Sequence, residues 1–245
     1  MKCPQCASTQ TAKNGHRRGR QCYKCKQCGR QFLESYRPWR YSEDVKQLCL
    51  KMYLNGMGLR GIERVTEIHH TTIMHWIRET GHQLKDAPEL EEIPEVTDLD
   101  ELQTFVGRKR NKLWIWTAVN HKQAGILAWV IGDRSAETFK PLWLIVKCWH
   151  CFFYVTDGWK VYPMFIEEGD QIVSKTYMTR VEGENTRLRH YLARLHRKTL
   201  CYSKSVEMLK CSLRLLLHYL KYQTVPLSAW FITLSAMPCV STNVN

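Results

Sequence analysis

The sequence predicts a mixed α+β protein made of consecutive modules, and three observations support this fold class. Two Cys-x-x-Cys pairs lie within the first 28 residues, apolar residues recur at helical spacing between 42 and 80, and runs of strand-forming residues begin near residue 99. The chain has 245 residues and 44% of them are hydrophobic, which is enough for a packed core. This composition excludes wholesale disorder.

The charge and cysteine content indicate a partner class and a compartment. The net charge is +13, from 36 Lys and Arg against 23 Asp and Glu. Such a basic surface favours nucleic acid as the partner, with an anionic membrane surface as the second choice. No apolar leader follows Met1, and the uncharged stretch 223–245 has too short an apolar core to span a bilayer. We therefore expect a cytoplasmic protein with no membrane partner, in which 223–245 forms a C-terminal tail.

The first module, residues 1–38, is predicted to be a zinc ribbon. Cys3/Cys6 and Cys25/Cys28 are two knuckles that can form one Cys₄ site for a structural Zn²⁺, while Cys22 is left free. A segment this short cannot build a core alone, so the metal would supply its folding free energy. Residues 1–40 carry ten basic residues against one acid, which indicates phosphate contacts; a solubilising loop is the alternative. The predicted DNA contacts of this module are Arg17, Arg18, Arg20 and Arg30.

The second module, residues 41–82, is predicted to be a helix-turn-helix unit. Ser42 caps a first helix, 59–65 forms a second, 66–69 a turn and 71–80 a third. A last helix presented after a short turn is typical of recognition in the major groove, although three amphipathic helices can also be a mere scaffold. Ile73, Trp76 and Ile77 should pack inward. The residues expected to face DNA are His70, Thr71, Thr72, His75 and Arg78.

An acidic linker, residues 83–97, is expected to lead into an α/β domain at 98–222. Strands are predicted at 99–107, 112–120, 125–132, 151–156 and 171–175, with a helix from Ser135 to Val146 and mostly helix over 181–222. Asp100 lies in the first strand, Asp157 follows a later one, and Glu182 opens a helix. Each acid also has an alternative interpretation. Asp100 can be part of the acidic linker, Asp157 can lie in a turn, and Glu182 can be a charge at a helix N-terminus.

Several of these segments together resemble the transposase of insertion sequence 1 and its relatives. They are the two knuckles, Leu-Arg-Gly-Ile-Glu-Arg at 59–64, Asp-Glu-Leu at 100–102, Phe-Val-Gly at 105–107, Thr-Asp-Gly-Trp at 156–159 and the stretch 187–205. The resemblance covers roughly residues 1–222, and 194–205 is its most specific part. It implies an RNase H-like catalytic domain that acts on DNA.

The resemblance also implies a catalytic triad. Carried over by position, its acids are Asp100, Asp157 and Glu182, and the last two are separated by the family's 24 residues. Glu184 is the rival for the third position but gives the wrong interval. Gln103 departs from the family's Trp at this position, which predicts looser packing beside the first strand.

The implied cofactor is a pair of Mg²⁺ or Mn²⁺ ions held by Asp100, Asp157 and Glu182. Such ions prefer carboxylate oxygens and can promote in-line phosphoryl transfer. Asn185, one turn after Glu182, is a candidate partner of the ligands. Basic residues that follow at helical spacing are expected to contact DNA, with a solvated helix face as the alternative. They are Arg187, Arg194, Arg197 and Lys198.

The function indicated by the sequence is that of a DNA transposase. It would bind the terminal inverted repeats of its element and cut and join strands of double-stranded DNA, both at the transposon ends and at the target. A homo-oligomer on DNA and a bacterial, nucleoid-associated location follow from the resemblance. Two alternatives stay open: a DNA-binding regulator with an inert catalytic domain, and a metal-dependent nuclease that does not join strands.

Overall fold

The computed structural model describes residues 1–17, 19–35, 41–87 and 89–226, and the chain divides into two compact units, 1–42 and 43–245. Two sequence predictions therefore lie wholly or mainly outside the described residues: the DNA contact assigned to Arg18, and the tail at 223–245, of which only the first four residues are described. Among the helices that are described, none has the length and apolar content needed to cross a bilayer.

The first unit is a small antiparallel sheet. Its strands are β1 (Thr11–Arg17), β2 (Arg20–Cys25) and β3 (Gln31–Leu33), in the order β1-β2-β3. The core of this sheet consists of Cys3, Cys25 and Phe32, with Tyr23 packed against them. Two of the three buried residues are cysteines, so apolar burial alone contributes little to the stability of this unit.

The second unit begins with the three helices that the sequence predicted: α1 (Glu43–Leu54), α2 (Leu59–Thr66) and α3 (His70–Gln83). Ile73, Trp76 and Ile77 are buried, as predicted from their spacing. Between α2 and α3 the chain turns at Glu67, whose φ of 58° ends α2 in the left-handed conformation.

A five-stranded mixed sheet follows, in the order β6-β5-β4-β7-β8. Its strands are β4 (Val96–Phe105), β5 (Lys112–Asn120), β6 (Ile126–Gly132), β7 (Phe153–Thr156) and β8 (Gln171–Val173). The pairs β4–β5 and β5–β6 are antiparallel, whereas β4–β7 and β7–β8 are parallel. All five predicted strands exist, with ends shifted by a few residues. The mixed α+β class is confirmed.

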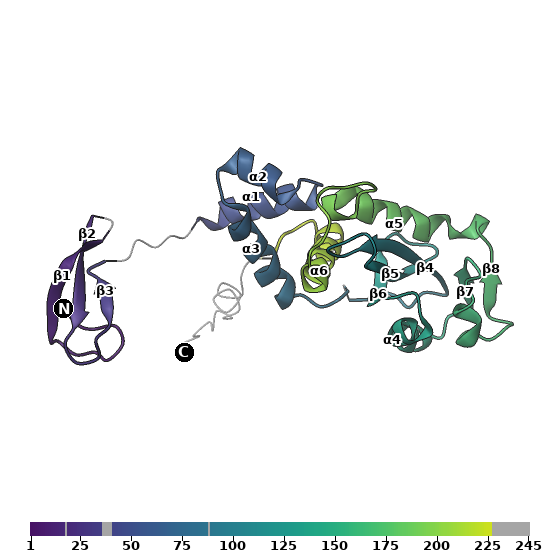
Figure 1. Ribbon diagram of the computed structural model, residues 1–245. Helices are drawn as coiled ribbons and strands as arrows, with labels where there is room; N and C mark the ends of the chain where they lie inside the picture. Colours follow the sequence, from purple (N-terminus) through teal and green to yellow (C-terminus); the bar gives the residue numbers. More distant parts are fainter. Residues whose placement is uncertain (18, 36–40, 88, 227–245) are drawn as a thin grey trace, which may run out of the picture. The chain divides into compact units, whose positions relative to one another are not determined.

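Helices cover both faces of this sheet (Figure 1). On one face, α4 (Ala136–Lys147), capped by Ser135 as predicted, packs against β5 and β6 around Leu99, Trp116 and Phe139. On the other face, α5 (Thr179–Tyr191) packs against β4 and β5 around Leu102 and Leu188. Because side chains alternate along a strand, the even-numbered residues of β4 face α5 and the odd-numbered residues face α4.

The last helix, α6 (Val206–Tyr222), shares a hydrophobic core with the three N-terminal helices of the unit. Tyr53 Oη on α1 lies 2.7 Å from Ser212 Oγ on α6, and Gly81 of α3 faces the backbone of Cys211. Helices α1, α2 and α3 and the last helix of the chain's α/β part therefore pack as one body here. The predicted module boundaries at 41–82, 83–97 and 98–222 remain predictions.

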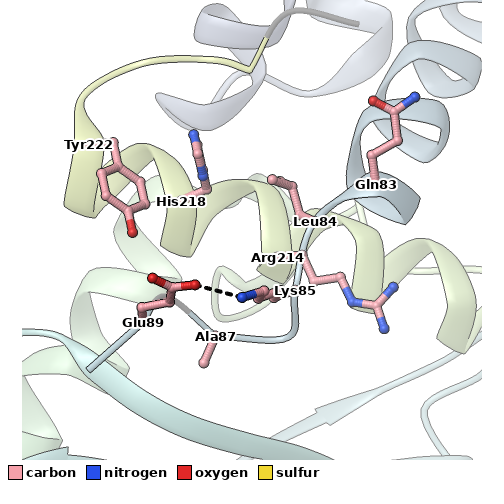
Figure 2. A pocket seen from close by; sticks show the side chains of 8 residues that line it. All are labelled: Gln83, Leu84, Lys85, Ala87, Glu89, Arg214, His218 and Tyr222. Atoms are coloured by element: carbon pink, nitrogen blue, oxygen red, sulfur yellow. Dashed lines mark hydrogen bonds and ion pairs between the residues drawn. The ribbon is translucent and has the colours of Figure 1, made fainter. Parts of the chain in front are cut away.

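The acidic segment after α3 is paired with bases of α6. Asp86 Oδ1 lies 2.7 Å from Arg214 Nε, and Glu91 Oε1 lies 3.2 Å from Lys221 Nζ. Figure 2 shows the pocket at this junction, which is lined by Gln83, Leu84, Lys85, Ala87 and Glu89 and by Arg214, His218 and Tyr222 of α6. In it Lys85 is paired with Glu89, and none of the predicted triad acids lines it. These ion pairs fix the path of the linker along α6.

Candidate functional site

The register of two parallel strands brings Asp100 and Asp157 together. Asp98 on β4 pairs with Val155 on β7, and two residues further along each strand are Asp100 and Asp157. Carboxylate oxygens of Asp100, Glu101 and Asp157 all lie within 4.8 Å of one another. Acids from two separate strands therefore converge at one end of β7, where a divalent cation can be held by oxygen ligands.

Asp100 is held by α5. Asn185 Nδ2 donates a hydrogen bond to Asp100 Oδ2 at 2.7 Å, and Thr117 Oγ1 on β5 donates to Asn185 Oδ1 at 3.4 Å. The pKa of Asp100 is raised to about 6, mainly by burial. The nearby carboxylate of Glu101 adds to this rise, whereas hydrogen bonds from the Glu101 backbone and from Asn185 oppose it. Asn185 is thus a direct partner of the first acid, the kind of role that its position one turn after Glu182 suggested.

Glu101 is a member of the cluster that the sequence did not predict. Its side chain is 2% exposed, on the α4 face of β4, and Tyr162 Oη donates to Glu101 Oε2 at 2.8 Å. Burial raises the pKa of Glu101, and the bonds from Tyr162 and Arg134 oppose that shift. A residue next to Asp100 should point to the opposite face of the strand, which is why sequence reasoning passed over it.

Arg134 supplies positive charge at the acid cluster. Its Nε donates to Glu101 Oε1 at 2.6 Å, and its Nη2 lies 3.8 Å from Asp157 Oδ2. The guanidinium also stacks on the Trp159 ring, 3.6 Å from the centroid. Arg134 therefore balances part of the negative charge of the clustered carboxylates, and Trp159 fixes its orientation.

Glu182 lies in the first turn of α5, where the sequence placed it, but its side chain is exposed and is not part of the 4.8 Å cluster. The rival Glu184 is buried, accepts a hydrogen bond from the Gly125 backbone N–H at 3.1 Å and pairs with Arg187 at 2.8 Å. Glu184 is thus committed to structural contacts, and the third acid of the triad stays a prediction.

Gln103 stands where the family has Trp. Its side chain is exposed on β4, and its backbone oxygen accepts a hydrogen bond from Arg189 at 3.4 Å. The looser packing expected beside the first strand stays a prediction.

The four predicted zinc ligands gather in the first unit. Their Sγ atoms lie within 4.8 Å of one another, with Cys3–Cys28 at 3.5 Å and Cys6–Cys25 at 3.6 Å. A tetrahedral ion with Zn–S bonds of about 2.3 Å separates its sulfurs by about 3.8 Å, so the four thiols fit Zn²⁺. Burial opposes ionisation of Cys3, but backbone N–H groups of the knuckle bring its pKa down to about 6.

The other cysteines that the sequence left aside take no part in a metal cluster within the described ranges. Cys22 is buried in β2 and lies outside the tetracysteine cluster. Cys148 is exposed, whereas Cys151 is buried with its Sγ 3.2 Å from Thr97 Oγ1. Both cysteines were expected to be buried thiols, and this holds for Cys151 but not for Cys148.

The predicted DNA contacts of the ribbon and of α3 differ in availability. Arg17 and Arg30 are exposed, while Arg20 is half-buried and donates to the Ser35 carbonyl at 2.9 Å. On α3, Thr71 and His75 are exposed and Thr72 is half-buried. His70 and Arg78 are half-buried, and each is paired with a glutamate.

Arg194 requires a correction. The sequence predicted a DNA contact, but the side chain is 7% exposed, its Nε donates to Tyr53 Oη at 2.5 Å and its Nη1 donates to Ser203 Oγ at 3.0 Å. The guanidinium donates its hydrogen bonds inside the protein, and Arg194 thereby links the segment 193–205 to α1. Arg187 is paired with Glu184, whereas Arg197 and Lys198 are exposed and free to meet a phosphate.

A groove of about 620 Å³ runs between α3 and the segment 193–208. One wall carries the α3 face that the sequence assigned to DNA, including His70, Thr71 and Arg78. The bases Arg60 and Lys204 also line it, and its lining contains no Asp or Glu. The groove therefore presents positive charge beside α3.

Together these features define a class: a mixed α+β protein with a carboxylate cluster suited to divalent cations and a separate tetracysteine cluster suited to zinc. Comparison with known proteins then identifies the family. The family model described as IS1 transposase matches residues 95–224, which include the whole sheet, the acid cluster, α5 and α6.

Individual relatives agree with this match. The protein InsB of insertion element iso-IS1n from Shigella dysenteriae is 34% identical over 113 residues, which are 46% of this chain and 86% of that protein. The InsB protein of insertion element IS1 from Shigella flexneri is 34% identical over 111 residues, 45% of this chain and 85% of that protein. The chain belongs to the IS1 transposase family.

Proposed function

We propose that this transposase binds the terminal inverted repeats of an insertion element and cuts and joins DNA strands with divalent cations held by Asp100, Asp157 and Glu182. The convergence of Asp100 and Asp157 on neighbouring parallel strands carries the proposal, because the two carboxylates are far apart in sequence and close together in space. The sheet order β6-β5-β4-β7-β8, with helices on both faces, supports an RNase H-like catalytic domain.

The donor set suits Mg²⁺ or Mn²⁺, since both ions prefer oxygen ligands. Divalent cations held there would supply charge stabilisation for in-line phosphoryl transfer. Asp100 and Asp157 would hold the ions, and Asn185 would keep Asp100 in place through its 2.7 Å hydrogen bond. Arg134 would limit repulsion among the carboxylates, and Glu182 would approach from the first turn of α5.

The third acid can be located with matched substitutions. Glu182→Gln should abolish cleavage without changing thermal stability, because the side chain is exposed. Glu184→Gln should retain cleavage and lower stability, because Glu184 is buried and bonded to Gly125 and Arg187. Full activity of Glu182→Gln together with an inactive but folded Glu101→Gln would move the third position to Glu101.

DNA binding is proposed for three surfaces. The groove beside α3, the exposed bases of the ribbon and the exposed pair Arg197 and Lys198 all present positive charge to phosphates. The exposed side chains near the start of α3, Thr71 and His75, would read base edges, as the first residues of a recognition helix do. Joining two transposon ends requires two copies of this machinery, and we therefore propose a homo-oligomer on DNA.

The test of the proposed function is an assay on a supercoiled plasmid that carries the element's terminal repeats, with Mg²⁺ or with chelator. Joined products in Mg²⁺ alone support the proposal. Nicks without joining would replace it with a nuclease, and a gel shift without any cleavage would replace it with a DNA-binding regulator. Asp157→Asn should bind the repeats and cleave nothing; cleavage by this variant would remove Asp157 from the site.

The proposed zinc site has its own test. Cys25→Ser should lose the Zn²⁺ of the first unit and weaken binding to the terminal repeats, because this unit has almost no apolar core. Cys22→Ser is the matched control, since Cys22 lies outside the tetracysteine cluster, and it should keep the metal. Unchanged zinc content in Cys25→Ser would refute the assignment.

A further inference from the structure

A second cluster of metal-ligating side chains lies at the turn between α2 and α3. Ligand atoms of Glu63, His69 and His70 are all within 4.8 Å of one another. Glu63 comes from α2, His69 is the N-cap residue of α3, and His70 is the first residue of α3. Two imidazoles and a carboxylate, supplied by two helices, are a ligand set typical of Zn²⁺ and related first-row cations.

We propose that Glu63, His69 and His70 bind a divalent transition-metal ion, Zn²⁺ in particular, which clamps the end of α2 to the start of α3. This site is separate from the tetracysteine cluster and from the acid cluster, and the proposal does not depend on the catalytic function.

The distances between the ligand atoms support this site. A tetrahedral ion with bonds of about 2.0–2.1 Å separates its N and O ligands by about 3.3 Å. His69 Nε2 lies 3.7 Å from Glu63 Oε1, and His70 Nδ1 lies 2.8 Å from Glu63 Oε2. Each ring nitrogen is thus within about 0.5 Å of that separation from one of the two Glu63 oxygens. A rotation of the carboxylate that turns one oxygen toward both rings, with small rotations of the rings, would admit the ion.

The surroundings of His69 also fit a metal ligand. Its Nδ1 lies 2.6 Å from Thr71 Oγ1, and a metal-bound histidine usually donates its second ring N–H to an oxygen of this kind. If Nε2 binds the metal, the ring proton of His69 must be on Nδ1. Nδ1 can then no longer accept the weak 3.3 Å hydrogen bond from the Thr71 backbone N–H. The hydroxyl contact would then fix the ring orientation.

Electrostatics at the turn are compatible with a cation. The N-terminus of α3 alone would repel one, because its backbone N–H groups carry partial positive charge. Glu63 lies in the last turn of α2, where the backbone carbonyl groups carry partial negative charge. Its carboxylate adds a full negative charge beside the two histidines. The two imidazole rings, 4.3 Å apart, would repel each other if both were protonated, and a shared ion removes that conflict.

An ion at this point would brace the turn that presents α3. The turn contains Glu67 in the left-handed conformation, and α2 has only eight residues. A short helix gains little stability by itself, so a link between its last turn and the next helix would fix the angle at which α3 is offered. The groove face of α3, which begins at His70 and Thr71, would be stabilised directly.

The experiment is metal titration of the full chain after removal of bound metals, in excess Mg²⁺ so that the acid cluster does not take up zinc. The wild-type chain should bind two equivalents of Zn²⁺, and the double variant His69→Ala/His70→Ala should bind one. The control His75→Ala, an exposed histidine of the same helix, should bind two. Glu63→Gln should weaken the binding of the second Zn²⁺ ion by about tenfold or more.

Cobalt substitution separates the two zinc sites. Co²⁺ in the tetracysteine site gives a thiolate charge-transfer band, while Co²⁺ at Glu63, His69 and His70 gives ligand-field absorption without that band. The double variant should keep the first signal and lose the second, which also shows that its ribbon remains folded. A wild-type chain that lacks the second cobalt signal, or a double variant that keeps it, would overturn the proposal.

Discussion

The substitution Asp100→Asn should make the metal-free protein more stable at neutral pH. Burial is the main cause of the raised pKa of Asp100, about 6 against an ordinary value of 3.8. Between these two values the folded chain still holds a proton that the unfolded chain has released. Stability therefore falls as the pH rises through this window, and the full cost is present above about pH 6.

The size of this effect follows from the shift. Two pKa units correspond to about 3 kcal/mol, since each unit is worth about 1.4 kcal/mol. Asparagine has nearly the same shape and no charge, and its carbonyl can still accept the hydrogen bond from Asn185. We expect Asp100→Asn to raise the free energy of unfolding by about 1–3 kcal/mol at pH 8 and by close to zero at pH 4.

Urea denaturation in chelator, at pH 8 and at pH 4, measures this difference. Glu182→Gln is the control, because an exposed acid should change the free energy of unfolding by less than about 0.5 kcal/mol. Addition of Mg²⁺ should stabilise the wild-type chain and leave Asp100→Asn nearly unchanged, because ligand binding stabilises only the form that binds. A metal-free Asp100→Asn chain that is less stable than wild type at pH 8 would show that burial does not set the pKa of Asp100.

Three further substitutions test the packing that places the site. Gly81→Ala should cost about 1–3 kcal/mol in thermal unfolding, because its Cβ would lie 2.6 Å from Cys211 Cβ; a gain would mean that α3 and α6 are not in contact. Tyr53→Phe should cost about 1–3 kcal/mol by leaving Ser212 and Arg194 without their buried partner, and unchanged stability would contradict those bonds. Ser135→Ala should cost about 1 kcal/mol because the hydroxyl caps α4 through the Thr138 N–H, whereas Ser35→Ala, at an exposed serine outside any helix, should cost nothing measurable.

Much of the secondary structure could be predicted from local patterns. Apolar spacing and the serine at position 135 located α1, α3 and α4, and runs of aromatic and branched residues located β4, β5 and β6. These features depend on neighbours within a few residues. The same local reasoning could not show that α6 joins the core of the N-terminal helices, because that contact links residues more than 100 positions apart.

The site was predictable in part, for a similar reason. Spacing alone proposed the four cysteines, since each knuckle is a local motif, and the resemblance singled out Asp100, Asp157 and Glu182. Glu101 was missed because strand alternation predicts that it points to the opposite face from Asp100. Its place in the cluster follows from the approach of its carboxylate to Asp157 and from its bonds to Arg134 and Tyr162. Arg194 was misassigned because a basic residue in a run of basic residues gives no sign in sequence that it is buried.

The amino-acid sequence by itself determined the order of the elements, the tetracysteine motif and the excess of positive charge, because each of these is set by residue types at short range. The tertiary structure decided which acids meet, which base neutralises them and how the turn before α3 gathers a carboxylate and two imidazoles. Those arrangements depend on strand register and on helix packing between distant segments, and a linear pattern carries no record of which side chains end up within a few ångströms of each other.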